Sequence, residues 1–474
     1  MTTQLPPAAA SRRSGAPAGA PPPAIMAGRR NLVVGLGQTG VSCVRYLTAR
    51  GEQVTVADSR ASPPDLAGFK LRWPNVECHC GSLDARLLDA VDRVVLSPGV
   101  DRRVELVADA VRRGIPVVGD VELFALDLRD SQPDAKVVGI TGTNGKSTVT
   151  ALIAAIAATA GVSVRAGANF GPPALDLLDP PRPELYALEL SSFQLESTDS
   201  LSLDVAVLLN LTPDHMDRYE SLADYGTAKG RIFNGAAIAV VNADDPALRP
   251  LVPAPVSTRW YSVVEAADYF IADVGDRSSL MAMTNGVATS VMRLDDMRLG
   301  GRHNAANALA ALAAGDALGL PRDAVTSTLA EFPGLPHRMQ TVATEGGVRY
   351  INDSKGTNVG ATLAAVGGID VPVVLIAGGD GKDQDFRPLA AGFAGKVRHA
   401  VLIGRDRHLV AAALAGVCTT EFAVDMPAAV AAAARHARPG DVVLLSPACA
   451  SLDMYRNYAA RGDAFAHAVK GLQS

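Results

Sequence analysis

The sequence has few cysteines, few aromatic residues and no long apolar run. Its 474 residues include 5 cysteines, odd in number and scattered, and 5% aromatic residues. Such cysteines are typical of free thiols in a reducing compartment, and no uncharged apolar run approaches the roughly 20 residues that cross a bilayer. The net charge of −5 offers no basic surface for nucleic acid or anionic lipid. We therefore expect a cytoplasmic protein that binds neither nucleic acid nor membrane. We also expect a monomer.

Two stretches lack what a functional site or a targeting signal would need. The "CHC" string at Cys78–Cys80 has no second Cys/His pair at zinc spacing, so we interpret it as alternating residues of a short strand. The first 28 residues are rich in Ala and Pro, contain no acidic residue and lack the apolar core of about 7–15 residues found in signal peptides. This composition predicts a disordered tail over residues 1–28, with Met26 as an alternative start.

What is present is a series of strand and helix patterns, in a chain long enough for about three domains. "RRNLVVGLGQTG" predicts a strand that enters a G-x-G-x-x-G turn, and "QVTVAD" predicts a second strand that ends at Asp58. Short alternating segments between about residues 257 and 301 predict hairpins, and "FPGLPHRMQ" predicts a linker. We predict an α/β protein with an N-terminal Rossmann-like domain (29–119), a central P-loop ATPase-like α/β sheet (120–334) and a C-terminal Rossmann-like domain (335–474).

The string "GITGTNGKST" predicts a shortened phosphate loop. In the common G-x-x-x-x-G-K-[ST] pattern the first glycine would fall on Ile140, but the nearest glycine is Gly142, which gives G-x-x-G-K-[ST]. An apolar strand precedes the loop and an Ala-rich helix follows it, so backbone N–H groups and the helix N-terminus can face phosphate oxygens. Lys146 would reach the β- and γ-phosphates, and the hydroxyl of Ser147 or Thr148 could ligate Mg²⁺. The alternative is a glycine turn with an incidental lysine.

Two further side chains follow strands of the same predicted sheet. Glu189 ends the strand in "LYALELSS", and His215 in "NLTPDHMDRY" follows the next strand. The carboxyl ends of parallel strands meet at one edge of a sheet, so both can converge with the loop hydroxyl on one metal ion. Oxygen ligands suit Mg²⁺, whereas a histidine ligand suits Mn²⁺ better. Taken singly, each residue fits a structural role as well.

Three other strings have more than one interpretation. "GLGQTG" with Asp58 by itself predicts an NAD or FAD site, but no hydride-transfer site follows downstream. "NDSKGTN" and "AGGDGKDQDF" follow apolar strands of the third domain. They are either exposed turns or, if they face the phosphate loop, a site for a carboxylate substrate.

Taken in order, the motifs resemble one family from about Asn31 to the C-terminus. TGTNGKST, ELSSFQLE, DHMDRY, HNAANALAAL, LPHR, NDSKGTN, GGDGKD and SPACASLD are similar to the ATP-dependent Mur ligases of peptidoglycan synthesis. That family uses the G-x-x-G-K-[ST] loop, so the glycine absent at position 140 is not a defect. The resemblance implies that ATP converts a carboxylate into an acyl phosphate, which an amine then attacks. ELSSFQLE and SPACASLD imply UDP-N-acetylmuramoyl-L-alanine and D-glutamate as the other substrates.

The resemblance also implies roles for individual residues. The implied ATP-binding set is Gly142, Thr143, Asn144, Gly145, Lys146, Ser147, Thr148, Asn307, Arg338 and Asp353. The implied catalytic set is Lys146, Glu189, His215 and Lys229, and the implied ligands of Mg²⁺ or Mn²⁺ are Ser147, Glu189, His215 and a carbamylated Lys229. The implied UDP-substrate set is Gln38, Thr39, Asp58, Ser59, Arg60, Gly99, Asn169, Ser191 and Gln194. The implied D-glutamate set is Thr357, Lys382, Ser451, Leu452 and Tyr458.

Two positions depart from the family pattern. Tyr458 stands where the family usually has Phe, and Gly356 stands where it usually has Ala. Two alternatives stay open on sequence alone. One is an NAD-dependent oxidoreductase; the other is a sibling ligase that adds a different amino acid, or a folylpolyglutamate-type enzyme.

Overall fold

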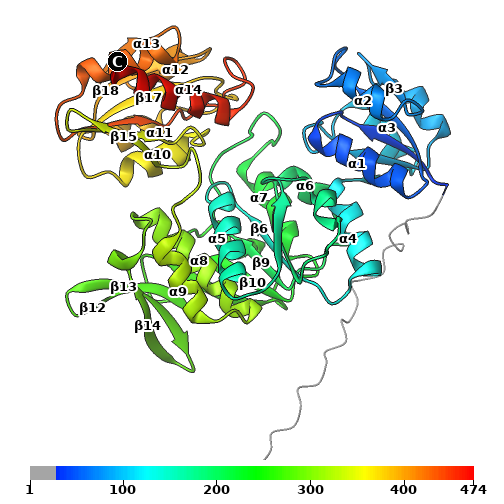
Figure 1. The fold of residues 1–474 in the computed structure, drawn as a ribbon, viewed down its shortest axis with the longest axis horizontal. Coiled ribbons are helices and arrows are strands. Elements are labelled where there is room, and N and C mark those ends of the chain that lie inside the picture. The colour runs from blue at the N-terminus through cyan, green and yellow to red at the C-terminus, as the bar shows by residue number, and fades with distance from the viewer. Residues whose placement is uncertain (1–27, 474) are drawn as a thin grey trace, which may run out of the picture.

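The computed structural model describes residues 28–473 of the chain. All but the last residue of the predicted tail (1–28) therefore lies outside the described part. Three α/β bodies follow one another along the chain, each with its own sheet (Figure 1). In the described part of the chain, no helix is long and apolar enough to cross a membrane. The predicted fold class, α/β with three sheets, is confirmed.

The N-terminal body is a five-stranded parallel sheet in the order β3-β2-β1-β4-β5. Its elements are β1 (Arg30–Val34), α1 (Gln38–Ala49), β2 (Gln53–Asp58), α2 (Leu66–Arg72), β3 (Glu77–Cys80), β4 (Arg93–Leu96), α3 (Glu105–Arg112) and β5 (Val117–Val118). The first turn of α1 requires glycine, because a Cβ on Gly40 would lie 1.9 Å from the carbonyl oxygen of Gly35, which follows β1. The "CHC" string lies in a short strand, as predicted, and this strand is at the edge of the sheet.

The central body is a nine-stranded sheet in the order β14-β13-β12-β11-β10-β9-β6-β8-β7. Its strands are β6 (Lys136–Thr141), β7 (Val164–Ala168), β8 (Leu185–Glu189), β9 (Val205–Leu208), β10 (Ile238–Asn242), β11 (Ser257–Ser262), β12 (Tyr269–Val274), β13 (Arg277–Thr284) and β14 (Val287–Arg293). The strands from β7 to β12 are parallel, and β12, β13 and β14 form the predicted antiparallel hairpins.

Helices cover both faces of this sheet. They are α4 (Asp120–Ser131), α5 (Lys146–Thr159), α6 (Ser192–Glu196), α7 (Leu222–Gly230), α8 (Arg302–Leu318) and α9 (Arg322–Glu331). The apolar residues of α5, α8 and α9 share one hydrophobic cluster with the strands, whereas those of α4, α6 and α7 belong to another. Because α5 is buried in this way, the phosphate loop in front of it is held rigidly against the sheet.

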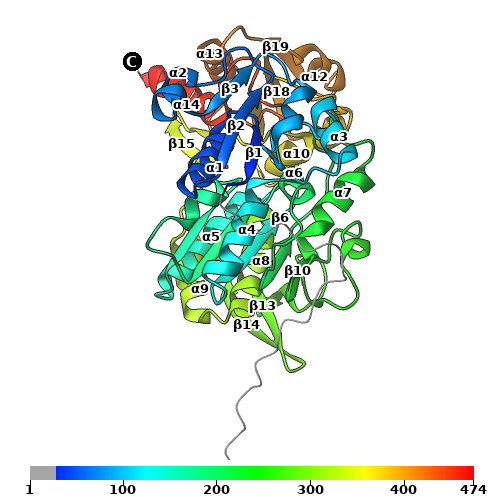
Figure 2. The same ribbon diagram turned by 90° about the vertical axis from the view of Figure 1, so that its right-hand side faces the viewer.

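The C-terminal body is a six-stranded sheet in the order β15-β16-β20-β17-β18-β19, parallel except for β15. Its elements are β15 (Gln340–Glu345), β16 (Val348–Asn352), α10 (Val359–Gly367), β17 (Val373–Gly378), α11 (Pro388–Phe393), β18 (Val397–Ile403), α12 (Arg407–Ala413), β19 (Thr419–Phe422), α13 (Met426–His436), β20 (Val442–Leu445) and α14 (Tyr458–Lys470). The second view of the molecule shows this body and the N-terminal body above the central one (Figure 2).

The predicted linker leads from the central sheet into β15. His337 and Met339, on either side of Arg338, have positive φ angles of 62° and 47°. Left-handed backbone at two residues with side chains is energetically costly and persists only where the surrounding structure imposes it. The double bend sets the direction of Arg338, whose guanidinium reaches Ser147 in the central body.

Candidate active site

The phosphate loop joins β6 to α5 and can be built only with glycine at two positions. Gly142 and Gly145 have φ angles of 148° and 85°. A Cβ on Gly142 would lie 2.9 Å from Leu209 Cβ, and one on Gly145 would lie 2.6 Å from Asn307 Oδ1. The tight loop therefore presses against β9 on one side and brings Asn307 of α8 against it on the other.

The ammonium of Lys146 lies over the loop. Its Nζ donates hydrogen bonds to the carbonyl oxygens of Gly142, at 2.9 Å, and Thr143, at 2.8 Å. Burial lowers the pKa of Lys146 more than the nearby carboxylates of Glu189 and Asp214 raise it. A half-buried cation at a helix N-terminus is a strong attractor for phosphate oxygens.

Glu189 is the centre of a compact polar cluster. Its carboxylate accepts a hydrogen bond of 2.5 Å from Ser147 Oγ and one of 2.6 Å from Asn169 Nδ2, and Arg338 Nη2 donates to Ser147 Oγ at 2.6 Å. Burial raises the pKa of Glu189, but the charge of Lys146 and the bonds from Ser147 and Asn169 together bring it below the ordinary value. Glu189 is therefore an anion although it is buried, and it can bind a cation.

Lys229 lies beneath the same loop and is 1% exposed. Its Nζ donates to Gly142 O at 2.9 Å and sits 4.4 Å from the centre of the Tyr225 ring. Burial, reinforced by the charge of Lys146, holds the pKa of Lys229 well below the ordinary value. A lowered pKa increases the share of the neutral amine, which is the nucleophilic form that reacts with CO₂ to give a carbamate.

His215 follows β9 at the same sheet edge, with a positive φ of 58°. Its ring packs edge-to-face on Phe193, with ring centroids 5.0 Å apart, and Nε2 lies 3.8 Å from Asp214 Oδ2. Burial lowers the pKa of His215 to about 4. The imidazole is therefore neutral at physiological pH and has a lone pair for a metal ion. Together with the carboxylate of Glu189 and the hydroxyl of Ser147, the donor set fits Mg²⁺ or Mn²⁺.

The C-terminal body contributes two contacts to this edge through Asp214. Lys382 Nζ donates to Asp214 Oδ1 at 2.7 Å, and Asn358 Nδ2 donates to Asp214 Oδ2 at 3.1 Å. Asn358 Nδ2 also donates to Asn144 Oδ1 of the phosphate loop at 3.2 Å. Burial opposes ionisation of Asp214, but Lys382 and His215 bring its pKa down to about 2. The sequence analysis missed Asp214 and Asn358, although both lie in quoted strings, DHMDRY and NDSKGTN.

A cavity of about 970 Å³ opens beside the phosphate loop, between the central and C-terminal bodies. Its volume is at the upper end of the range usual for ligand sites. Its lining includes Asn144, Gly145, Thr148, Asn307, Arg338 and Asp353. Six of the ten residues predicted for ATP, from three separate stretches of sequence, therefore line one cavity, whereas Gly142, Thr143, Lys146 and Ser147 are not part of its lining.

The carboxyl group of Asp353, which lines this cavity, is buried and has a raised pKa. Ser446 Oγ donates to its Oδ2 at 2.8 Å. Burial outweighs that bond and the nearby Arg338, and it raises the pKa of Asp353 to about 7.

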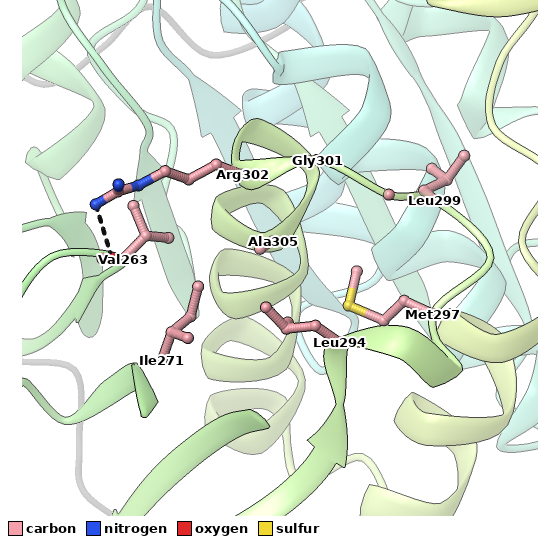
Figure 3. Close-up of a pocket in the computed structure, with 9 residues that line it drawn as sticks. Val263, Ile271, Leu294, Met297, Leu299, Gly301, Arg302 and Ala305 are labelled. Atoms are coloured by element: carbon pink, nitrogen blue, oxygen red, sulfur yellow. Dashed lines mark hydrogen bonds between the residues drawn. The ribbon is translucent and has the colours of Figure 1, made fainter. Parts of the chain in front are cut away.

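A second, smaller cavity of about 340 Å³ lies between α8 and the hairpin strands (Figure 3). Its lining is mainly aliphatic, with Ile271, Leu294 and Met297 pointing into it. The Arg302 guanidinium on its rim donates to Val263 O at 3.0 Å. This cavity has few polar groups for a nucleotide, so the larger one is the better candidate.

The residues predicted for D-glutamate are spread over the C-terminal body. Ser451 is buried, whereas the Leu452 side chain is 71% exposed. Tyr458 begins α14, and the ammonium of Lys355 lies 4.1 Å from the centre of its ring. Burial lowers the pKa of Lys355 to about 8. Among these predicted residues, Lys382 makes the direct contact with the central body described above.

The residues predicted for the UDP-substrate fall into two groups. In the N-terminal body, Asp58 accepts hydrogen bonds from Leu36 N at 2.7 Å and from Arg60 Nη2 at 2.7 Å. Desolvation opposes these bonds, but they bring the pKa of Asp58 to about 2. Gln38 and Thr39 begin α1. Ser59, between Asp58 and Arg60 in the sequence, is exposed, and Gly99 has open space around it. Asp58 therefore has an internal partner where a dinucleotide site would need a free acceptor for the ribose.

The second group lies in the central body. Asn169 follows β7 and holds Glu189. Ser191 and Gln194 form a capping box at the start of α6, in which Ser191 Oγ accepts from Gln194 N at 3.2 Å. These three residues have structural partners of their own at the carboxyl edge of the sheet.

The sequence matches three domain families that occur in the same order along the chain. The Mur ligase MurD-like N-terminal domain matches residues 29–119, the Mur ligase middle domain residues 140–315, and the Mur ligase glutamate ligase domain residues 337–449. A UDP-N-acetylmuramoylalanine–D-glutamate ligase of Pseudomonas savastanoi pv. phaseolicola is 46% identical over 456 residues, which cover 94% of this chain and 99% of that protein. The ligase of that name from Methylococcus capsulatus is 47% identical over 445 residues, which cover 94% and 95%.

A solved structure shares the fold at much lower identity. The MurF ligase from Thermotoga maritima in complex with ADP aligns with a TM-score of 0.57 and 18% identity, covering 82% of this chain and 98% of that one.

Proposed function

The chain belongs to the Mur ligase family, and from that premise we propose its function in full. It is an ATP-dependent ligase that forms the amide between UDP-N-acetylmuramoyl-L-alanine and D-glutamate in peptidoglycan synthesis. The relatives at 46% and 47% identity, aligned over 94% of the chain, carry that activity in their names. The structural observation that best supports this function is the cluster of Lys146, Ser147 and Glu189 beside the large cavity. The cluster supplies positive charge, an anion and a helix N-terminus at the place where a triphosphate must be held.

The chemistry needs neutralisation of crowded anions more than it needs acid–base catalysis. A carboxylate oxygen of the alanyl group forms a bond to the γ-phosphorus of ATP, and the bond to ADP breaks with its electrons going to ADP. Lys146 and Arg338 would lie against the phosphate oxygens and offset their charge. Mg²⁺ or Mn²⁺, held by Glu189, Ser147 and His215, would supply further charge neutralisation.

The second step joins the amine of D-glutamate to the activated carbonyl carbon. Phosphate leaves with the electrons of the C–O bond, and the amine loses its proton. Lys382 is placed to bind a carboxylate of D-glutamate, because its ammonium already holds the carboxylate of Asp214 at 2.7 Å. A carbamate on Lys229 would turn a cation beneath the loop into an oxygen ligand for the metal ion.

The division into domains at 29–119, 120–334 and 335–474 is part of the proposal, and the three separate sheets support it. The N-terminal body would hold the UDP group through the glycine turn and the Asp58–Arg60 pair. We also propose that the enzyme acts as a monomer in the cytoplasm, where its nucleotide substrates are made.

One assay tests this function. Purified protein receives ATP, Mg²⁺ and UDP-N-acetylmuramoyl-L-alanine, and phosphate release is followed with each amino acid in turn. We expect release with D-glutamate and none with L-glutamate, L-alanine, L-lysine or diaminopimelate. Turnover with another amino acid, or oxidation of NADH by the protein, would contradict the proposal.

A further inference from the structure

Two histidines and a glutamate meet on the C-terminal body, outside the site described above. His399 belongs to β18, Glu421 to the edge strand β19, and His436 is the last residue of α13. His436 Nε2 lies 3.3 Å and His399 Nε2 lies 3.9 Å from Glu421 Oε2. One ligand atom from each side chain lies within 4.8 Å of those of the other two. Two neighbouring strands and the helix that follows them in the chain thus present two imidazoles and a carboxylate to one point.

His399 has a buried nitrogen with no partner. The residue is 4% exposed, and its Nε2 makes no hydrogen bond although it faces Glu421. Its other nitrogen, Nδ1, lies 2.7 Å from Thr419 Oγ1. When Nδ1–H donates to that hydroxyl, the lone pair is on Nε2 and points toward the cluster, which is the arrangement that supports a metal-bound histidine. Leaving such a nitrogen unsatisfied costs free energy that a metal ion would recover.

We infer that His399, Glu421 and His436 form a binding site for a divalent transition-metal ion of the zinc class. Imidazole and carboxylate ligands select Zn²⁺, Ni²⁺ or Cu²⁺ over Mg²⁺ and Ca²⁺, which take oxygen ligands. His436 and Glu421 are partly exposed, with side-chain accessibilities of 42% and 37%, so an ion can enter from solvent. The two imidazoles are now stacked, with centroids 3.6 Å apart; binding turns the ring of His436, the exposed member, so that Nε2 faces the ion.

The topology separates this site from the phosphate loop. His399 lies near the start of β18, Thr419 at the start of β19, and His436 at the end of a helix that leads back to the start of β20. His399, Thr419 and His436 are therefore toward the amino edge of the parallel strands, and Glu421 lies two residues further along β19, whereas Lys382 and Ser446 follow carboxyl ends. In both views α13 lies at the end of this body that faces away from the central one (Figures 1 and 2). The ion would tie the edge strand β19 to β18 and α13, a structural role independent of the ligase reaction.

Arg435 competes with a metal ion for the carboxylate of Glu421. Its Nη2 donates to Glu421 Oε1 at 2.9 Å. The guanidinium repels a second cation and occupies one oxygen of the ligand. Removal of this charge should therefore tighten metal binding, an outcome that a purely structural His–Glu contact would not produce.

The test uses full-length protein freed of metal with a chelator and then titrated with Zn²⁺ in millimolar Mg²⁺, which occupies the ligase site. Zn²⁺ affinity is read by competition with a chromophoric chelator, and the melting temperature is recorded with and without Zn²⁺. We expect one bound Zn²⁺ and a raised melting temperature, since a ligand that binds only the folded state stabilises it. His436→Ala and Glu421→Gln should each weaken binding at least tenfold, the loss that even supporting residues of metal sites produce. Arg435→Gln should strengthen it.

His408→Ala is the matched control, because His408 is another exposed histidine of the same body and packs on Phe422 instead. It should bind Zn²⁺ as the unaltered protein does, and all four variants should keep ligase activity without Zn²⁺, which shows that they fold. Equal Zn²⁺ affinity of His436→Ala and the unaltered protein would overturn the site. So would the absence of any bound Zn²⁺ at micromolar concentration.

Discussion

At the scale of single residues, this site differs from the rest of the surface because its charged side chains are shielded from solvent. Lys146, Lys229 and Glu189 lie around one loop, and each keeps or loses its charge according to its neighbours. In low dielectric surroundings these interactions are strong, so single substitutions should have large effects.

Lys146→Ala should lower kcat by on the order of 10²–10³-fold, because it removes a cation that offsets transition-state charge. Phosphate release in the full reaction is the measurement. The control is Lys70→Ala, an exposed lysine on α2, which should be silent. Near-normal turnover by Lys146→Ala would refute the assignment of this loop to ATP.

Lys229→Ala should also lose activity, and the rescue pattern identifies the chemistry of this residue. If Lys229 carries a carbamate, acetate or formate should partly restore turnover, because either can supply the lost oxygen ligand. A cationic role predicts rescue by small amines instead. Full activity without any additive would show that Lys229 is only a packing residue.

Asp353→Asn should change how stability depends on pH. The folded-state pKa of about 7 is above the ordinary value of about 3.9, so the folded protein binds more protons than the unfolded chain between these values. Stability therefore falls as pH rises from about 4 to 7. The substitution should flatten this part of the curve and leave the protein a few kcal/mol more stable at pH 8 than the unaltered one, by order of magnitude. Urea unfolding at pH 4 and pH 8 measures the effect; parallel curves would contradict it.

At the scale of elements, the start of α6 combines a helix cap with a predicted substrate contact. Ser191→Ala should destabilise the protein by about 1 kcal/mol through loss of the capping box. Ser191→Asp keeps a capping side chain and should retain the melting temperature, but its charge should raise the KM for the anionic UDP-substrate. Unchanged kinetics of Ser191→Asp would restrict Ser191 to its capping role.

At the scale of the whole molecule, the central and C-terminal bodies are joined across the site by Lys382 and Asp214, which are both largely buried. Removal of one partner of a buried ion pair leaves an uncompensated charge and is strongly destabilising. Asp214→Asn should therefore weaken the contact between the two bodies, and small-angle scattering without substrates should show a larger radius of gyration. Arg405→Ala, which removes an ion pair on the surface of the C-terminal body, is the control and should not expand the molecule. An unchanged radius for Asp214→Asn would show that other contacts hold the bodies together.

The local elements and the order of the motifs could be predicted from the amino-acid sequence. The glycine turn at Gly35–Gly40 and the phosphate loop with the helix behind it follow from short-range rules of backbone freedom and apolar periodicity, and the structure has them where they were predicted. The short strand β15 was missed because it begins at Gln340, the last residue of the predicted linker, where proline and glycine dominate the local signal.

Which separate residues meet depends on the folded arrangement of the chain. Asp214 faces Lys382 and Asn358, Arg338 reaches Ser147 through a strained linker, and His399, Glu421 and His436 converge on one point. Contacts of this kind depend on strand order, on the packing of separate bodies and on burial, none of which is encoded in the spacing of neighbouring residues. The perturbed pKa values of Lys229 and Asp353 have the same origin, because desolvation is a property of the folded environment and not of the residue type.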